Sequence, residues 1–295
     1  MNQNQSLQLM LLTFGPNIKN HYQACFCILS FLKDPLKPAV TVYTDRPEFY
    51  RCFEGQVDLV VVDQVQLQAW RGEADFFWRI KCKAVEDMVL RHPGQHIMYV
   101  DSDTFLGGGL QDVIQHLDQG QTLMHLNEGK LAQLDTKTTR NMWQVLAGSC
   151  HEGITIDKGS AMWNAGVVAL PGPIASAVAE HTVAVCDSLC ATKAPRKLLE
   201  QFAFSLALNH AVALQPADTW IGHYWGNKEQ WNAAIAEFYL HSKLYNRNLQ
   251  EDIAAASEFA YDSIALHCRV SSSNRRLKGL AETLFPNKVH QYFKH

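Results

Sequence analysis

The sequence lacks several features that would identify whole classes of protein. Its 295 residues carry a formal net charge of only −3, so the chain has no excess of positive charge that would attract nucleic acid. Its eight cysteines form no C-x-x-C pair, which in a chain of this size favours reduced thiols over a disulfide framework or a zinc knuckle. No apolar run is long enough to span a membrane, and there is no internal repeat or low-complexity segment.

The first residues of the sequence do not have the pattern expected of a signal peptide. These residues, MNQNQS, are polar and uncharged, and the apolar run over residues 9–14 is too short for the core of a signal peptide. Apolar residues make up 47% of the chain and charged residues 19%, as in ordinary soluble globular proteins. We therefore expect a cytoplasmic protein that neither spans a membrane nor binds nucleic acid.

The first hundred residues alternate between apolar runs and helical patterns. Apolar runs predict strands over residues 7–14, 39–45, 57–63 and 97–100. Three- and four-residue spacing of apolar residues predicts helices over 18–32 and 74–91, the second with Phe77 and Ile80 inward and Lys81 and Lys83 outward. Because continuous apolar strands are typical of sheets covered on both faces, the pattern indicates an α/β fold with a mixed, mainly parallel sheet and flanking helices.

The pattern loosens after residue 120 and becomes mostly helical near the end. Strands are expected over 121–129 and 159–172, and helices over 174–191 and 197–209. We expect a main domain over residues 1–230 and a helical C-terminal extension, residues 231–295, packed on it. A capped helix is expected from Ser273 to Leu284, in a basic segment with Arg275, Arg276 and Lys278.

Two aspartates follow the strand at 97–100. Alternate residues of an extended chain point the same way, so Asp101 and Asp103 can direct their carboxylates to one point. Burial of this pair is costly unless a positive charge offsets it. Mg²⁺ and Mn²⁺ take oxygen ligands and leave positions open for substrate phosphates, so we expect a metal bound to a diphosphate here. The alternative is that one aspartate caps a turn and the other is solvated.

Four segments carry a family resemblance. YVDSDTFL is similar to the D-x-D motif of glycosyltransferases with the GT-A (Rossmann-like) fold. In chain order, WNAGVVAL, LEQFAFSLAL and GHYWGNK resemble three motifs of the retaining, family 8-like branch: N-A-G-[VI], [DE]-Q-x-x-x-[NS] and H-[YF]-x-G-x-x-K. The matches together cover roughly residues 7–230.

The resemblance implies a reaction. Residues 1–230 would be a GT-A-like catalytic domain that binds a nucleoside diphosphate sugar, with a UDP-sugar favoured. The enzyme would be a hexosyltransferase-like glycosyltransferase that transfers the sugar to a saccharide or other hydroxyl acceptor, with retention of anomeric configuration. Its cofactor would be a divalent metal, manganese (Mn²⁺) or magnesium (Mg²⁺).

The resemblance also implies roles for individual residues. The expected metal ligands are Asp101, Asp103 and His223, with His267 as the competing third ligand. Near the anomeric carbon and in the sugar pocket, the expected polar groups are Glu200, Gln201 and Asn164. The expected nucleotide-sugar-binding residues are Thr13, Phe14, Asn17, Thr44, Asp45, Arg79, Lys83, Asp101, Ser102, Asp103, Gly166 and Lys228. Four aromatic residues would shape the acceptor site or belong to the core: Trp220, Tyr224, Trp225 and Trp231.

Three other functions fit parts of the same pattern. A non-catalytic sugar-nucleotide-binding or scaffold protein could share the fold, although both aspartates are present. Haloacid dehalogenase-type phosphatases use D-x-D-x-[TV], but Phe105 stands at the last position, and their pair lies early in the chain. Nucleotidyltransferases share a similar sheet, but no G-x-G-x-R loop follows the first strand.

Overall fold

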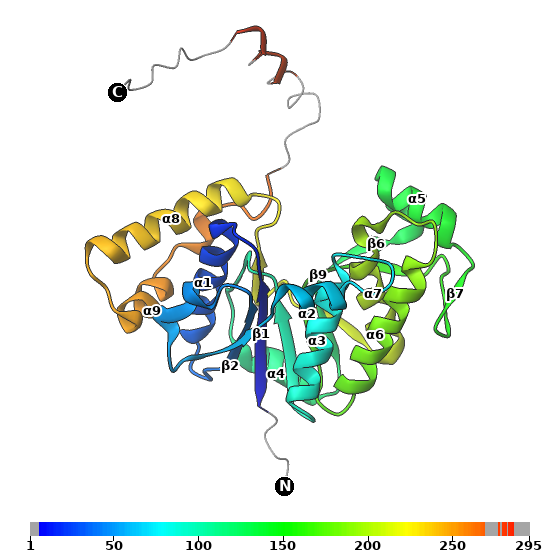
Figure 1. The fold of residues 1–295 in the computed structure, drawn as a ribbon, viewed down its shortest axis with the longest axis horizontal. Helices are drawn as coiled ribbons and strands as arrows, with labels where there is room; N and C mark the ends of the chain where they lie inside the picture. Colours follow the sequence, from blue (N-terminus) through cyan, green and yellow to red (C-terminus); the bar gives the residue numbers. More distant parts are fainter. Residues whose placement is uncertain (1–5, 269–276, 278, 282, 286–295) are drawn as a thin grey trace.

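The computed structural model describes residues 6–268, 277, 279–281 and 283–285. Within them, helices cover both faces of a seven-stranded sheet of order β10-β6-β9-β4-β1-β2-β3 (Figure 1). The predicted α/β class with a mixed, mainly parallel sheet is therefore confirmed. The strands of this sheet are β1 (Leu7–Thr13), β2 (Ala39–Thr44), β3 (Val57–Val61), β4 (His96–Val100), β6 (Thr122–Lys130), β9 (Ala161–Leu170) and β10 (Leu214–Pro216).

The sheet is mixed because of β9. Four pairs of strands are parallel: β1–β2, β1–β4, β2–β3 and β6–β10. Strand β9 lies between β4 and β6 and is antiparallel to both. The strands expected from the apolar runs are all present. Strand β3 differs in its environment: it is the edge strand and leaves Val61 62% exposed, although its apolar run suggested burial on both faces.

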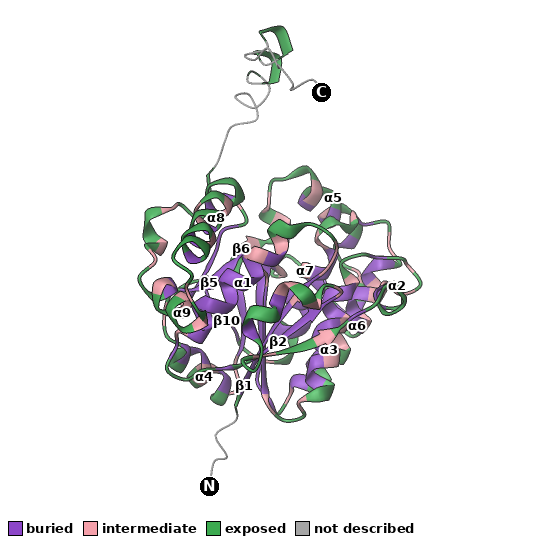
Figure 2. Ribbon diagram, turned by 60° about the vertical axis from the view of Figure 1, so that its left-hand side comes forward, coloured by how far each residue is buried: buried purple, intermediate pink, exposed green. Residues whose placement is uncertain are grey.

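Helices pack on the two faces of the sheet in separate groups. The described helices are α1 (Ile18–Leu32), α2 (Gln64–Trp70), α3 (Arg79–Arg91), α4 (Leu110–Asp118), α5 (Lys137–Leu146), α6 (Ala175–Cys190), α7 (Leu199–Ala211), α8 (Lys228–Leu244) and α9 (Leu249–Ser257). One hydrophobic cluster includes α3, α5, α6 and α7, and the other includes α1, α4, α8 and α9. Figure 2 shows the buried sheet between them. In β1, Leu9 and Leu11 face the α1 side and Met10 the α3 side, as strand alternation requires.

Short elements complete the fold. Strand β5 (Thr104–Leu106) pairs with β11 (Ile221–His223), and β7 (Cys150–His151) with β8 (Ile154–Thr155). The short 3₁₀ helices are η1 (Pro47–Phe53), η2 (Leu131–Gln133), η3 (Arg196–Leu198) and η4 (Tyr261–Ser263).

Helix α3 is shorter than its apolar spacing predicts. It begins at Arg79 rather than at residue 74, because the preceding chain turns through Asp75, whose φ is 45°. Two expected orientations are therefore wrong. Phe77 precedes the helix and is 39% exposed, and Lys81 is buried with 7% exposure because its ammonium group has carboxylate partners inside the protein.

The chain after β11 packs on α1. Phe26 of α1 contacts Phe238 of α8 and Phe259 after α9, with ring centroids 5.3 and 4.9 Å apart. The expected helical character is present in α8 and α9, whereas the domain boundary at residue 230 stays a prediction. The expected helix over 273–284 lies mostly outside the described residues, as do its basic residues at 275, 276 and 278. In the described part of the chain, no helix has the length and apolar character needed to cross a membrane.

Candidate metal centre and cavity

The candidate site lies at the carboxyl end of β4, near the middle of the sheet. Val100 pairs with Leu11 of β1, so Asp101 lies at the same sheet edge as Thr13. Ligands of open α/β sheets collect at this edge. After Asp103 the chain enters β5, whose antiparallel pairing with β11 places His223 opposite Thr104.

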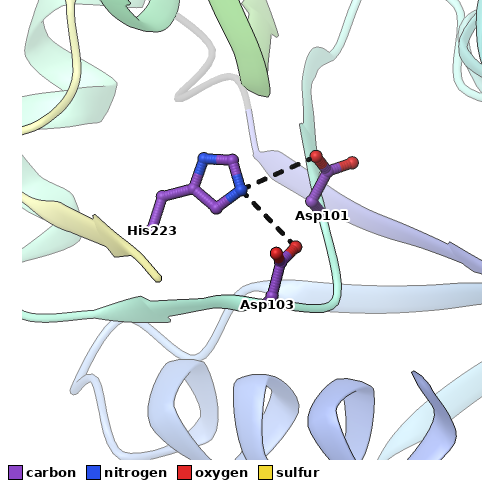
Figure 3. A group of neighbouring side chains, drawn as sticks. All are labelled: Asp101, Asp103 and His223. Carbon is purple, nitrogen blue, oxygen red and sulfur yellow. Dashed lines mark ion pairs between the residues drawn. The ribbon is translucent and has the colours of Figure 1, made fainter. Parts of the chain in front are cut away.

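Asp101, Asp103 and His223 form a three-residue cluster (Figure 3). One ligand atom from each lies within 4.8 Å of the others. The Nε2 atom of His223 is 3.8 Å from Asp101 Oδ2 and 3.5 Å from Asp103 Oδ1. Two carboxylate oxygens and one imidazole nitrogen suit a divalent ion, so the predicted ligand set can hold one. His267 lies outside this cluster, against the ring of Trp225.

Asn164 fixes the orientation of the His223 ring. Its Oδ1 atom accepts a hydrogen bond from the backbone N–H of Gly166 and lies 3.0 Å from His223 Nδ1. Because the amide oxygen can only accept, His223 Nδ1 carries the proton. In the neutral ring, the lone pair of Nε2 then faces the two aspartates, as a metal ligand requires.

Gly166 leaves the space that His223 needs. A Cβ atom at this position would overlap the imidazole ring of His223. His125 packs edge-on against the same ring, with centroids 5.1 Å apart. Burial lowers the pKa of His125 to about 4, so this neighbour is neutral and adds no cation beside the metal cluster.

We expect Asn164→Leu to weaken Mn²⁺ binding by about 10–100-fold, as losses of such supporting hydrogen bonds commonly do. The leucine removes the acceptor for His223 Nδ1–H, so the ring no longer favours the productive tautomer. Isothermal titration with Mn²⁺ measures the effect. Asn164→Asp/Glu128→Gln keeps an acceptor oxygen for His223 and avoids two facing carboxylates, because Asn164 Nδ2 lies 3.1 Å from Glu128, so it is the matched variant. An equal loss in both variants would contradict the role of this hydrogen bond.

Lys81 is the buried positive charge beside the aspartate pair. Its Nζ atom lies 3.2 Å from Asp101 Oδ1 and 3.1 Å from Glu200 Oε1, and donates to the backbone oxygen of Ala165 at 2.6 Å. Tyr99 also donates to Asp101 Oδ1, at 2.6 Å. Lys81 and Tyr99 therefore occupy Oδ1 of Asp101, while Oδ2 faces His223.

The charges in this group depend on one another. Burial alone would lower the pKa of Lys81, but the carboxylates of Asp101 and Glu200 raise it above its ordinary value. Burial raises the pKa of Glu200, and the Lys81 ammonium opposes this shift. Lys81 thus holds one carboxylate of the metal cluster and one of the sugar-pocket candidates in a single buried ion-pair network.

Asp103 is held by partners on two sides. Its Oδ2 atom lies 2.7 Å from Lys228 Nζ, and its Oδ1 atom faces His223. Burial alone would raise the pKa of Asp103, but the His223 ring, where it carries both protons, and the Lys228 ammonium lower it well below its usual range. Asp103 is therefore ionised over the physiological pH range, as a metal ligand must be.

These groups open into one cavity of about 700 Å³. Most of the predicted site residues line it: Thr13, Phe14, Asp101, Ser102, Asp103, Asn164, Gly166, Glu200, Gln201, His223 and Lys228. A nucleotide sugar is the kind of ligand for which a cavity of this size has room.

Five predicted residues do not line the cavity. Asn17 caps α1 by accepting from the Lys19 N–H, and the Thr44 hydroxyl accepts from the Arg46 N–H. The remaining three have partners elsewhere. Asp45 accepts hydrogen bonds from Gly15 and Gln64, and ion pairs join Arg79 to Asp187 and Lys83 to Glu86. Asp45 still supports the loop after β1, because its carboxylate accepts the Gly15 N–H at 2.9 Å.

The four aromatic residues expected near the acceptor separate into two groups. Trp225 lines the cavity and is 51% exposed. Tyr224 and Trp231 are fully buried and stack on each other, with centroids 4.6 Å apart, and Trp220 packs partly buried against the same core. Only Trp225 of this set is therefore available to a ligand in the cavity.

Glu128 is a cavity residue that the sequence reasoning missed. Its two oxygens accept from Asn164 Nδ2 and Gln201 Nε2, each at 3.1 Å. The sequence did show this carboxylate near the end of the strand predicted over 121–129, where polar residues often reach a binding site. Glu128 links the predicted sugar-pocket residues to the hydrogen bond that orients His223.

The chain is similar to known proteins in structure, whereas no similarity in sequence was found. No protein-family model matches the chain, and no curated protein matches it in sequence. Solved structures do match. One of them is the apo form of mouse xyloside xylosyltransferase 1, which is 11% identical, with a TM-score of 0.45 over 72% of this chain and 84% of that chain.

Proposed function

We propose that this protein is a metal-dependent glycosyltransferase. It transfers a sugar from a nucleoside diphosphate sugar, with a UDP-sugar favoured, to a saccharide or other hydroxyl acceptor, with retention of anomeric configuration. One observation carries the proposal: Asp101, Asp103 and His223 converge beside Lys228 at the edge of a cavity of about 700 Å³. Such a set suits a metal-bound diphosphate, and the first and last of the four family-like motifs, YVDSDTFL and GHYWGNK, supply these residues.

The leaving group is bound at the aspartate end of the cavity. Asp101, Asp103 and His223 would hold Mn²⁺ or Mg²⁺, which when bound neutralises charge on the departing diphosphate. Lys228 would donate a charge-assisted hydrogen bond to a phosphate oxygen. Its side chain is half exposed, so it can turn from Asp103 toward a ligand.

The sugar is bound between the polar groups of β9, α7 and β6. Glu200 and Gln201 would stabilise positive charge that develops at the anomeric carbon, and Lys81 holds the Glu200 carboxylate in place. Thr13 and Phe14, at the end of β1, would contact the nucleoside, and Trp225 would offer a ring face to the acceptor. The main domain would cover residues 1–230 and act in the cytoplasm.

A thermal-shift panel tests the proposal. UDP, GDP, CDP and dTDP are each added with and without Mn²⁺, and a ligand at one hundred times its dissociation constant stabilises the fold by about 2.7 kcal/mol. We expect a shift for one diphosphate only when the metal is present, followed by sugar transfer from the matching donor. A shift without transfer would favour the sugar-nucleotide-binding scaffold, and no shift at all would contradict the proposal.

We expect Lys228→Ala to weaken binding of the nucleoside diphosphate by about 10–100-fold, the loss typical of one charge-assisted hydrogen bond. Binding of the monophosphate should change less, because the proposed contact is to the second phosphate. Titration calorimetry with both nucleotides measures the difference. Lys243→Ala, at the far end of α8, is the control. An equal loss for the two nucleotides would count against this role.

A further inference from the structure

Residues 264–268, here called the strap, lie against the loop that joins β11 to α8. Asn227 Nδ2 donates to the backbone oxygen of Ala265 at 2.7 Å, and Trp231 Nε1 donates to the same oxygen at 3.1 Å. The backbone N–H of Cys268 donates to the oxygen of Gly226 at 3.1 Å. The strap contributes only backbone atoms to these three hydrogen bonds.

The other side of this loop meets the metal centre. The N–H of Tyr224 donates to the backbone oxygen of Asp103 at 3.1 Å, and Lys228, where the loop ends, lies 2.7 Å from the Asp103 carboxylate. His223, where the loop begins, is a member of the metal cluster. The loop therefore lies between the strap and Asp103 and carries a functional side chain at each end.

The strap approaches the loop very closely. A Cβ atom at Gly226 would overlap the side chain of His267, so position 226 takes glycine as long as histidine stands at 267 in the paired strap. The imidazole of His267 lies over Trp225, with centroids 5.0 Å apart, and Trp225 lines the cavity. A shift of the strap would therefore move the cavity wall as well as the loop.

The chain just before the strap packs on the strand that follows Asp103. Tyr261 packs on Phe105, with centroids 4.5 Å apart, and Phe105 packs on Trp231 at 5.0 Å. Phe105 belongs to β5, which follows Asp103 directly. One aromatic stack thus connects the strap, the start of α8 and the strand beside the aspartates.

We propose that the strap is a positioning element of the diphosphate site. It holds residues 224–228 so that Lys228 and His223 reach the point that Asp103 faces, and a displaced strap weakens diphosphate binding. The nature of the ligand rests on the proposed function, whereas the coupling of strap and loop rests on their hydrogen bonds and side-chain packing. The strap lies beyond residue 230, so the C-terminal extension contributes to the site.

Gly226→Ala, with a second-site rescue, tests this coupling. The added methyl group pushes the His267 ring and the strap away, and we expect UDP affinity in the presence of Mn²⁺ to fall about 10-fold or more, as for a misplaced charge-assisted hydrogen bond. UMP affinity should change much less. Gly226→Ala/His267→Gly removes the clash and leaves the backbone hydrogen bonds, so it should restore UDP binding, and His267→Gly alone should resemble the wild type.

Hydrogen exchange gives a readout that needs no ligand. The amides of Tyr224 and Asn227 should exchange faster in Gly226→Ala and return to the wild-type rate in the double variant. If Gly226→Ala does not fold, Trp231→Phe keeps a smaller aromatic ring in the core and removes one hydrogen bond to Ala265; it should speed the same exchange.

The two proposals fail in different ways. If the wild type binds no nucleotide, the proposed function is wrong, and the exchange rates alone decide on the strap. The positioning role would be overturned if folded Gly226→Ala showed unchanged exchange rates and unchanged UDP affinity. It would also be overturned if Gly226→Ala lost UDP affinity and the added His267→Gly change did not restore it. Restored binding and exchange in the double variant would establish it.

Discussion

Asp103→Asn should abolish metal-dependent nucleotide binding and turnover while leaving the fold intact. The substitution keeps the size of the side chain but removes a buried anion that His223 and Lys228 both contact. Loss of a direct ligand should weaken metal affinity by at least about 100-fold, since loss of a supporting contact alone costs about 10–100-fold. Titration calorimetry with Mn²⁺ and UDP measures the loss, and circular dichroism checks the fold.

A matched control separates this effect from a general change of charge. Asp135→Asn removes one negative charge from an exposed ion pair with Arg140, and we expect wild-type binding and turnover. Turnover in Asp103→Asn at the wild-type level would refute the site. Loss of turnover with retained Mn²⁺ affinity would show that Asp103 acts on the substrate without binding the metal.

Lys81→Met should be the most destabilising single change in the site. Methionine fills similar space, but Asp101 and Glu200 then face each other without the ammonium group between them. Removal of one partner from a buried ion pair commonly costs about 3–5 kcal/mol, because the other charge stays buried and unpaired. Urea unfolding monitored by tryptophan fluorescence gives the change in free energy of unfolding.

Lys83→Met, two residues later on the same helix, is the control for Lys81→Met. Lys83 pairs with Glu86 near the helix surface, so its loss should change stability by less than about 1 kcal/mol. Similar destabilisation by both substitutions would mean that the burial of Lys81 has no special role. A stable Lys81→Met protein would require that Glu200 takes up a proton, which a rise in its pKa would report.

The strands and the aspartate pair could be predicted because their signals are local. Buried parallel strands are continuous apolar runs, and the Asp101/Asp103 spacing is read within three residues. The start of helix α1 was predicted correctly because Asn17 caps it and apolar residues recur along one face from Ile18 onward. Helices α4 and α5 were missed because nine or ten residues give only two to three turns in which a pattern can repeat.

Lys81 was predicted on the wrong side of its helix for a physical reason. A lysine is rarely buried unless it is paired, so its charge argued for the surface. Its partners come from the residue just after β4 and from α7, and no pattern within α3 reveals them. The same applies to Arg79, whose partner Asp187 lies on α6. The positions of both side chains were set by ion pairs with residues distant in the sequence, which spacing within one helix does not encode.

His223 shows what motif order can and cannot supply. The resemblance of GHYWGNK to a family segment predicted a ligand, and the β5–β11 pairing places His223 beside Asp103. The hydrogen bonds that orient it come from Asn164 and, through Asn164, from Glu128. Asn164 was expected to contact sugar, a role that stays a prediction; its orienting contact depends on side-chain geometry.

The pairing of β5 with β11 also bears on how the protein is made. Asp103 and His223 meet only when a segment near residue 104 pairs with one near residue 222, and contacts this distant along the chain form late in folding. A nascent chain therefore has both aspartates long before it has the histidine. Metal affinity should develop only after translation passes residue 223, so metal binding would report that the sheet and its last short strand have assembled.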